Sequence, residues 1–285
     1  MARFAETIRR ELPLKAISVS MQDIARIYSR LKDCVAEQAE KEVSAIQIAP
    51  GQSEQDFAQY VERARAEAFH VSVLIKGADG SQLFDDDERI FTSNNLPDKI
   101  SSIFMTNITA YKTFSGVQPV HSFELFLDFD KPPLLDGENL VSSPTPNASS
   151  LLVSGSSNSW VASASGAVLD ILSNRKIRHG WLHGSFVYDV GLLLFALPVA
   201  IYVAWKLSPF VKEHIGIYSE FLSASVYIYT VFMCAWAYRV LFGYTKWAFP
   251  LVELSDQATW TQKHRRFWWG MLAALLTGFV LDVIL

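Results

Sequence analysis

Apolar residues recur at two different periods in the N-terminal part of this 285-residue chain. Between residues 21 and 43 they are spaced by three and four, which predicts a helix with one buried face. Ser20 and Asp23 have the spacing of a capping box, so the helix should begin at residue 21. A second helix is expected from Ser53, which has Asp56 at the equivalent position. The apolar face of the first helix consists of Met21, Ile24, Tyr28, Leu31 and Val35.

From residue 69 the period changes to that of strands. The sequence FHVSVLIKGADGSQLF predicts a hairpin around its GADG turn, and VHSFELFLDFD over 120–130 alternates more strictly than any other segment. Residues 130–150 are rich in Pro, Gly, Asn and Ser and predict a loop. Two further strands are expected at 88–91 and 150–155, and a closing helix at 157–176. Residues 98–112 could be helix or strand, and their β-branched residues favour strand. Residues 1–175 are therefore predicted to form an α+β domain of helices and an antiparallel sheet.

The remaining residues, 176–285, are predicted to form an all-α membrane domain. Three segments have the roughly 20 mostly apolar residues that a spanning helix needs, at about 186–205, 221–241 and 267–285. The alternative is helices buried in a large soluble core, but Trp and Tyr at the segment ends are typical of a membrane interface. Pro198 lies within the first segment and is expected to kink it by removing a backbone hydrogen bond.

Basic residues flank these segments unevenly. Arg175, Lys176 and Arg178 precede the first one, and Lys263, Arg265 and Arg266 precede the third, whereas the loop after the first has fewer bases. The positive-inside rule then places the N-terminal domain in the cytoplasm and the C-terminus on the far side of a plasma or inner membrane. An N-terminus without an uninterrupted apolar stretch agrees with this orientation.

Two charges fall inside the apolar segments near their cytoplasmic ends. Asp189 lies near the start of the first and Arg239 near the end of the second, so the two are expected at similar depth in antiparallel helices. Each is costly alone in hydrocarbon, which favours an intramembrane pair. The pair would be either a structural clamp or a polar gate, and the alternative is that each side chain reaches the interface separately.

The segment between the second and third spans, GYTKWAFPLVELSDQATWTQKHRR, mixes aromatic, aliphatic and charged residues. It could lie in the plane of the interface or dock on the soluble domain, and the sequence leaves both readings open.

Signals of catalytic chemistry are sparse. Asp128 and Asp130 share one face at the end of a predicted strand and are weak candidates for holding a divalent cation. The six histidines are scattered, none beside a nucleophile motif, and the two cysteines are not at metal spacing. No nucleotide-binding or hydrolase motif occurs. A net charge of −4 does not favour nucleic acid. The chain is expected to be a non-enzyme without a cofactor.

These patterns predict a multi-pass membrane protein whose cytosolic domain binds or senses a partner. A helix running into the first span through residues 173–183 would pass its state to the bundle, although Gly180 and Gly184 could act as hinges. Expected partners are the lipid bilayer and either further copies of the chain or another protein. The alternatives are a membrane-tethered metal-dependent enzyme using Asp128 and Asp130, and an oligomeric channel or pore-forming effector with Asp189 and Arg239 at its gate.

Overall fold

The structure is a computed structural model that describes residues 7–48, 53–134, 143–217 and 219–284. Its chain divides into two compact units. The sheet domain comprises Met1–Asp130, Asn147–Ile177 and Val252–Ala258, and the helical domain comprises Lys131–Pro146, Arg178–Leu251 and Thr259–Leu285. The sequence predicts a single domain boundary at 175/176. In the structure the chain passes from the sheet domain to the helical domain at 177/178, and it also passes between the domains earlier and later in the sequence.

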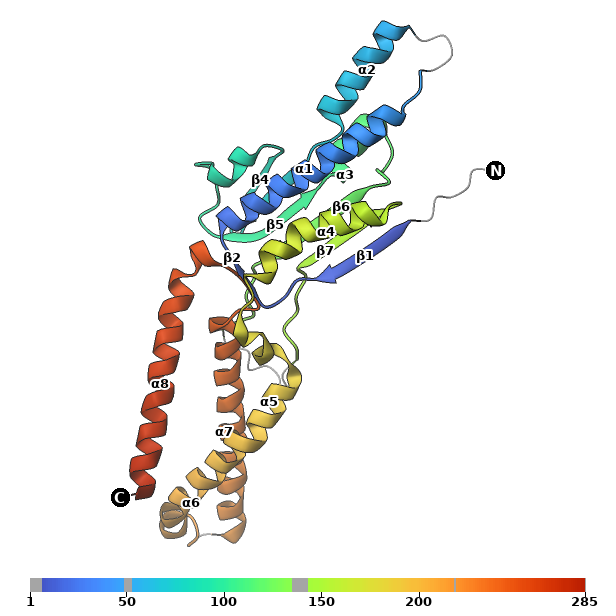
Figure 1. Ribbon diagram of the computed structural model, residues 1–285. Coiled ribbons are helices and arrows are strands. Elements are labelled where there is room, and N and C mark those ends of the chain that lie inside the picture. The colour runs from blue at the N-terminus through green and yellow to red at the C-terminus, as the bar shows by residue number, and fades with distance from the viewer. Residues whose placement is uncertain (1–6, 49–52, 135–142, 218, 285) are drawn as a thin grey trace. The chain divides into compact units, whose positions relative to one another are not determined.

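The sheet domain has a six-stranded, fully antiparallel sheet in the order β1-β7-β6-β5-β3-β4 (Figure 1). The predicted hairpin is confirmed, and its turn contains Gly80 at φ +87°, a backbone angle that favours glycine. The strict alternation of β6 is also confirmed, because its residues are in turn half-buried and buried. The strands are β1 (Ile8–Pro13), β3 (Ser72–Gly77), β4 (Gln82–Asp85), β5 (Ile100–Thr106), β6 (Ser122–Asp128) and β7 (Ser150–Gly155).

Helices α1 (Met21–Ala45) and α4 (Asn158–Ser173) pack against each other over the sheet (Figure 1). The predicted apolar face of α1 is buried, with Ile24, Tyr28 and Leu31 fully inaccessible. Removing such a side chain from water contributes about 1.5–3 kcal/mol. Helix α2 (Glu54–Glu67) begins after Ser53 as predicted, but of its residues only Ala64 is buried. The short helix α3 (Ile108–Ser115) follows β5.

Two expected strands differ from the structure. Residues 88–91, ERIF, lie in a 3₁₀ helix (η1, Glu88–Thr92) whose N-cap Asp87 accepts from the Arg89 N–H. That local hydrogen bond favours a helical turn over a strand. The segment 98–112 is divided between β5 and α3. The Asn107 side chain ends the strand, because it donates to the His121 carbonyl just before β6 and accepts from the Phe123 N–H.

A second, two-stranded sheet joins distant parts of the sequence. Strand β2 (Ile17–Val19) pairs in parallel with β8 (Val252–Leu254), which lies between the second and third predicted spans. A short 3₁₀ turn, η4 (Ser255–Gln257), follows β8. The segment that the sequence left open therefore contributes a strand to the sheet domain.

The helical domain contains one long irregular helix that begins at Ser185. It consists of α5 (Ser185–Gly191), a π-helical turn (η3, Leu192–Ala196) and α6 (Leu197–His214). The Leu197 N–H bonds to the Leu192 carbonyl, five residues back, directly before Pro198. The helix is thus irregular where the proline was expected to disturb it, since a proline nitrogen cannot donate to the preceding turn.

Two further helices complete the helical domain, α7 (Glu220–Ala248) and α8 (Thr259–Ile284). Ser185–His214 and α7 are long and apolar enough to cross a membrane. At about 1.5 Å per residue the first, with 30 residues, is about 45 Å long, more than a hydrocarbon core of about 30 Å. These helices contain the first two predicted spans. The third predicted span falls in α8, except for Leu285, which lies outside the described residues.

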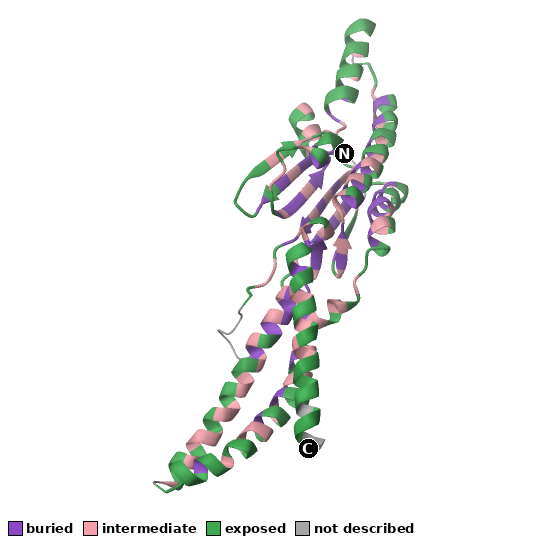
Figure 2. Cartoon of the chain, turned by 90° about the vertical axis from the view of Figure 1, so that its left-hand side faces the viewer, coloured by how far each residue is buried: buried purple, intermediate pink, exposed green. Residues whose placement is uncertain are grey.

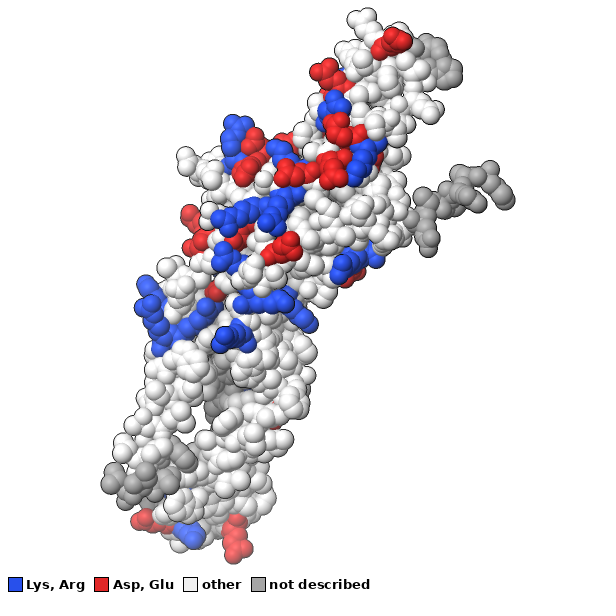
Figure 3. Space-filling model, in the orientation of Figure 1, with Lys and Arg blue, Asp and Glu red and all other residues white. Residues whose placement is uncertain are grey.

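The two domains differ in how they treat apolar side chains. Figure 2 shows buried residues concentrated in the sheet and its helices, and mostly exposed or half-buried residues on α6, α7 and α8. In the most apolar windows of the two candidate spans, 22% and 0% of residues are buried. The face of these helices seen in Figure 3 has few charged side chains between its ends. A helix in the core of a soluble protein would be mostly buried, so this surface is typical of helices facing lipid.

Candidate functional site

The candidate site lies in the sheet domain, where three separate stretches of chain meet. We call it the joint and define it as residues 16–23, 175–177 and 252–257. Its framework is the parallel ladder in which Ile17, Ser18 and Val19 pair with the three residues of β8. All three β8 residues, Val252, Glu253 and Leu254, are buried. Strand β8 is therefore part of the interior of the sheet domain.

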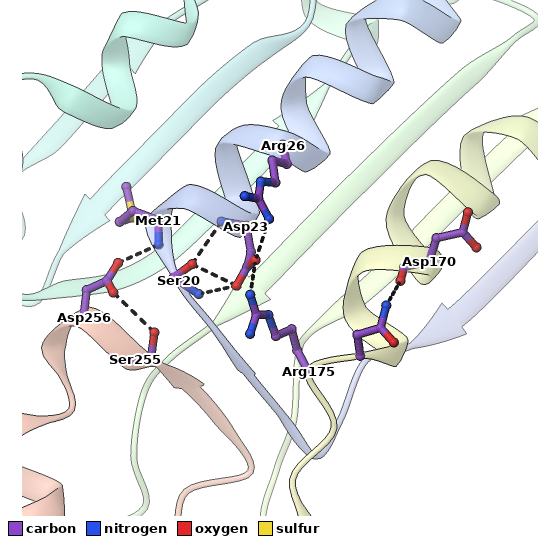
Figure 4. Close-up of polar contacts among 9 residues, drawn as sticks. Ser20, Met21, Asp23, Arg26, Asp170, Arg175, Ser255 and Asp256 are labelled. Atoms are coloured by element: carbon purple, nitrogen blue, oxygen red, sulfur yellow. Dashed lines mark hydrogen bonds and ion pairs between the residues drawn. The ribbon is translucent and has the colours of Figure 1, made fainter.

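The N-terminus of α1 is the polar centre of the joint (Figure 4). The predicted capping box is present, because the Ser20 hydroxyl accepts from the Asp23 N–H and the Asp23 carboxylate accepts from the Ser20 N–H, both at 3.1 Å. Asp23 is only 2% exposed. Its Oδ1 accepts a hydrogen bond from Arg175 Nη2 at 2.8 Å, which ties the stretch after α4 to the start of α1.

The turn after β8 contacts the same helix end. Asp256 Oδ2 accepts from the Met21 N–H at 2.7 Å, a backbone group that has no acceptor within α1 (Figure 4). A carboxylate at a helix N-terminus is also favoured by the helix dipole. Gln257 bonds the start of β5, accepting from the Ile100 N–H at 2.9 Å and donating to the Asp98 carbonyl at 3.2 Å. The β8–η4 segment is thus held by both ladder and side-chain bonds.

The stretch after α4 is not the continuous helix into the membrane that the sequence predicts. Helix α4 ends at Ser173, where Asn174 Nδ2 donates to the Asp170 carbonyl and satisfies part of the helix end. The chain then runs beside β2, with the Ser18 N–H bonded to the Arg175 carbonyl and the Ile177 N–H to the Ala16 carbonyl. Any coupling to the first span therefore starts from this bonded stretch.

Ala16 adopts φ +60°, the left-handed region that costs a non-glycine residue about 1 kcal/mol or more. It is the only such non-glycine residue among the described ranges. Its carbonyl accepts from Ile177. The hydrogen bonds between residues 16–18 and 175–177 hold Ala16 in this unfavourable backbone conformation.

Opposing effects set the pKa of Asp23. Burial by itself raises the pKa of this carboxyl, but hydrogen bonds from Arg175 and Ser20 outweigh burial and hold it below the ordinary value of 3.8. Asp23 is therefore ionised at neutral pH, as its bonds to Arg175 and the helix N-terminus require.

Most of the predicted basic cluster belongs to the helical domain. Arg178, Lys263 and Arg266 are exposed, whereas Arg265 donates from Nε to the Ala248 carbonyl at 2.8 Å and lies over the Phe249 ring. The other two members, Arg175 and Lys176, lie in the joint. Arg175 donates to Asp23, and Lys176 forms an isolated antiparallel β-bridge with Ile17. The predicted cluster therefore contains exposed side chains as well as residues that form hydrogen bonds within the protein.

The intramembrane pair stays a prediction. Arg239 is buried, and its guanidinium carbon lies 5.6 Å from the centre of the Tyr188 ring, while Asp189 is exposed. Tyr238 donates to the Tyr188 carbonyl at 3.0 Å, so α5 and α7 are bonded at this level. Asp282 of α8 forms an ion pair of 3.0 Å with Lys206 of α6.

His183 is a buried polar residue, one of the six histidines that the sequence shows only as scattered. Its Nε2 donates to the Phe249 carbonyl at 2.7 Å, so its Nδ1 accepts from the Thr145 hydroxyl at 2.8 Å. Burial lowers the pKa of His183, the hydrogen bond to the Phe249 carbonyl partly opposes this shift, and the charge of Lys246 lowers the pKa further. Burial and the nearby Arg265 charge lower the pKa of His179 as well. The neutral imidazole of His183 connects Thr145 to Phe249, the residue that follows α7.

Asp128 and Asp130 lie where β6 ends. Asp128 is half-buried, and its Oδ1 accepts from the Asp130 N–H at 3.0 Å, while Asp130 is exposed. No group of three His, Cys, Asp or Glu side chains suited to a metal ion occurs among the described residues. Whether these carboxylates hold a cation stays a prediction.

The geometry defines a class in broad terms: an α+β domain with a six-stranded antiparallel sheet, joined to helices of which two are able to span a membrane. Compared with protein-family models, curated proteins and solved structures, the chain has no significant match.

Proposed function

We propose that this is a multi-pass membrane protein whose cytosolic sheet domain binds a partner or signal and transmits its bound state to the membrane helices. The observation that carries the proposal concerns β8. This strand follows α7 and precedes α8 along the chain, yet it belongs to the sheet domain. The chain leaves the joint at Ile177 towards α5 and re-enters at Val252 from α7. It leaves again at Ala258, directly before α8. A change in the sheet domain therefore acts on all three helices through short covalent connections.

The pairing of β8 with β2 also supports a topology. Chain that leaves the sheet domain at Ile177 and returns to it at Val252 must cross the bilayer an even number of times. Two candidate spans, Ser185–His214 and α7, meet that requirement as a hairpin. The positive-inside rule puts the sheet domain in the cytoplasm. With α8 as third span, the C-terminus reaches the far side.

The lipid bilayer is the first partner of this arrangement. Large aromatic side chains are exposed near the exposed bases of the predicted cluster, as Trp181 near Arg178 and Trp260 near Lys263 in sequence. Indole rings favour the headgroup level, and lysine and arginine favour anionic headgroups. A second partner, either another copy of the chain or another protein, would bind the sheet domain.

Topology is tested with single reporter cysteines in a variant that lacks Cys34 and Cys234. Reporters at Ser255, in the turn after β8, and at Ser81, in the β3–β4 turn, should be protected from a membrane-impermeant maleimide in intact cells. A reporter at Gly216, between α6 and α7, should be labelled. Labelling of Ser81 and Ser255 on opposite sides would contradict the proposal.

Coupling is tested by loosening the joint and observing the membrane helices. Asp256→Ala removes the acceptor of the Met21 N–H, and hydrogen exchange at the adjoining ends of α7 and α8 should become faster in the detergent-solubilised protein. Asp170→Ala is the matched control, because Asp170 is exposed and its ion pair with Arg30 is 3.7 Å long. Equal exchange in both variants would show that the joint does not constrain the helices.

A further inference from the structure

Three side chains of the sheet domain are connected in series by hydrogen bonds, and no sequence motif indicates this arrangement. Ser156 Oγ lies 3.2 Å from His121 Nε2, and His121 Nδ1 lies 3.0 Å from Glu42 Oε1. Ser156 follows β7, His121 precedes β6 and Glu42 belongs to α1. Hydroxyl, imidazole and carboxylate in this order are the arrangement with which serine hydrolases activate their nucleophile.

Two side chains of α1 face His121 Nδ1. Glu42 Oε1 lies 3.0 Å from this nitrogen and can accept its proton, whereas Gln38 Nε2 lies 2.9 Å from it and can only donate. Glu42 Oε1 also accepts from Gln38 Nε2 at 3.0 Å, so the carboxylate is an acceptor for two donors. With the His121 Nδ1–H donated to Glu42, the Nε2 lone pair faces the Ser156 hydroxyl. In this tautomer the imidazole can take the hydroxyl proton.

Neighbouring residues hold the imidazole in place. The Trp160 ring meets it edge to face at 5.7 Å, and Trp160 is itself fixed by donating from Nε1 to the Ser154 carbonyl at 3.0 Å. A Cβ at Gly155 would lie 2.9 Å from His121 Cδ2 and 2.6 Å from Trp160 Cδ1. The absence of a side chain at Gly155 is therefore what allows the histidine and tryptophan to approach the turn.

The nucleophile is open to solvent while its partners are shielded. The side chains of His121 and Glu42 are 12% and 24% exposed, whereas Ser156 is exposed. Ser156 also directly precedes Ser157, the N-cap of α4, which makes no side-chain capping bond. The first N–H groups of that helix have no acceptor within it, so they are available to an anionic oxygen.

We propose that Ser156, His121 and Glu42 form a serine-hydrolase site for carboxylic esters, an activity beyond the function proposed above. Ser156 Oγ bonds to the ester carbonyl carbon while its proton passes to His121 Nε2. The carbon–oxygen bond to the alcohol then breaks, and that alcohol leaves with the proton from His121. Water repeats the sequence on the acyl-serine, giving the carboxylic acid and restoring the Ser156 hydroxyl. Ser156 and His121 are catalytic residues, and Glu42 is a positioning residue.

The test uses the full chain in mild detergent. A fluorophosphonate probe should label Ser156, as located by mass spectrometry, and p-nitrophenyl acetate should release p-nitrophenolate. Ser156→Ala should abolish both signals, and His121→Gln should lower the rate by about 10²–10⁴-fold. The matched control is Ser173→Ala, an exposed serine at the opposite end of α4 that should keep the wild-type rate. Labelling that persists in Ser156→Ala, or no labelling of the folded wild-type protein, would overturn the proposal.

Glu42 is separated from a merely structural role by its conservative variant. Glu42→Gln keeps the size of the side chain but loses the charge that stabilises the imidazolium, so the rate should fall by up to about 10⁴-fold. Glu42→Asp should restore part of that loss, with the melting temperature of the three proteins compared in parallel. Equal rates in wild type and Glu42→Gln would remove Glu42 from the site.

Discussion

The two domains use apolar residues in opposite ways. In the sheet domain, Leu127 of β6 and Ile103 of β5 are fully buried between sheet and helices. In the helical domain, residues of the same kind, such as Leu194 and Phe232, are 64% and 58% exposed. Apolar burial against protein stabilises the first, whereas the second has on its surface the apolar side chains that are typical of helices facing lipid. The difference teaches that similar residues build a protein core in one domain and an apolar outer surface in the other.

The largest expected effect is on the packed core. Leu127→Ala should lower the free energy of unfolding of the sheet domain by about 2–5 kcal/mol, because it leaves a cavity at a fully buried position. Leu194→Ala, at an exposed position of the helical domain, should change it by less than about 0.5 kcal/mol. Hydrogen exchange of the β5 and β6 amides in denaturant measures both. Equal effects would break the contrast between the domains.

Replacing an exposed phenylalanine by arginine in each domain tests whether the helical domain faces lipid. Phe232→Arg, near the middle of α7, should lower the membrane-inserted fraction, since arginine costs about 3 kcal/mol at the centre of a span. Phe84→Arg in β4 of the sheet domain replaces a phenylalanine of similar exposure, 60%, and should be tolerated. The fraction of protein resisting alkaline extraction from membranes is the measurement. Retention of both variants would argue against α7 facing lipid.

Substitutions in the joint are expected to have an intermediate effect on the free energy of unfolding. Asp23→Ala removes the acceptor of Arg175 and half of the capping box and should cost about 1–3 kcal/mol in unfolding of the sheet domain. The exposed Asp170→Ala should cost less than about 0.5 kcal/mol. Because the pKa of Asp23 is lowered by folding, its contribution is complete above the ordinary pKa of 3.8. It is lost as the pH falls below that value towards the folded-state pKa. Denaturation curves at several pH values check both points.

The smallest expected effect is a pH dependence confined to the helical domain. Folding lowers the pKa of His183 below 6.5, so the unfolded segment binds a proton more readily than the folded one. The contacts of His183 are therefore fully stable above this value and weaken as the pH falls below it, when protonation removes the acceptor for Thr145. Exchange of the Ser143 and Thr145 amides, corrected for intrinsic rate, should be faster at about pH 5.5 than at about pH 7.5. In His183→Gln this dependence should disappear, and its persistence would assign the effect to another group.

The sequence was most informative where one local signal was strong. The spacing of Ile24, Tyr28 and Leu31 and the Ser20–Asp23 pair sufficed for α1, and alternation sufficed for β6. Strand β1 was not predicted, because it lies at the edge of the sheet and most of its residues are exposed, which leaves no alternation to detect. Strand β8 was left open because three residues carry too little periodicity, and its partner β2 is more than 200 positions away.

The candidate sites were less accessible to sequence reasoning than the fold. Arg175 was assigned to the interface from its basic neighbours, whereas a buried carboxylate across the fold binds it. Nothing in the local sequence of Ser156, His121 and Glu42 marks them as a group, since each comes from a different element.

The sequence by itself determined the helices with regular apolar faces, the alternating strands and the apolar composition of the two candidate spans, because these depend on residues near one another in the chain. Only the tertiary structure decided that the segment after α7 is a strand of the sheet domain, that Asp23 binds Arg175 and that Ser156 lies beside His121. Each of these contacts joins residues that are far apart in the sequence, so forming it costs the conformational entropy of a long loop. Burial of apolar side chains in the folded domain offsets that cost, and the local sequence does not reveal it.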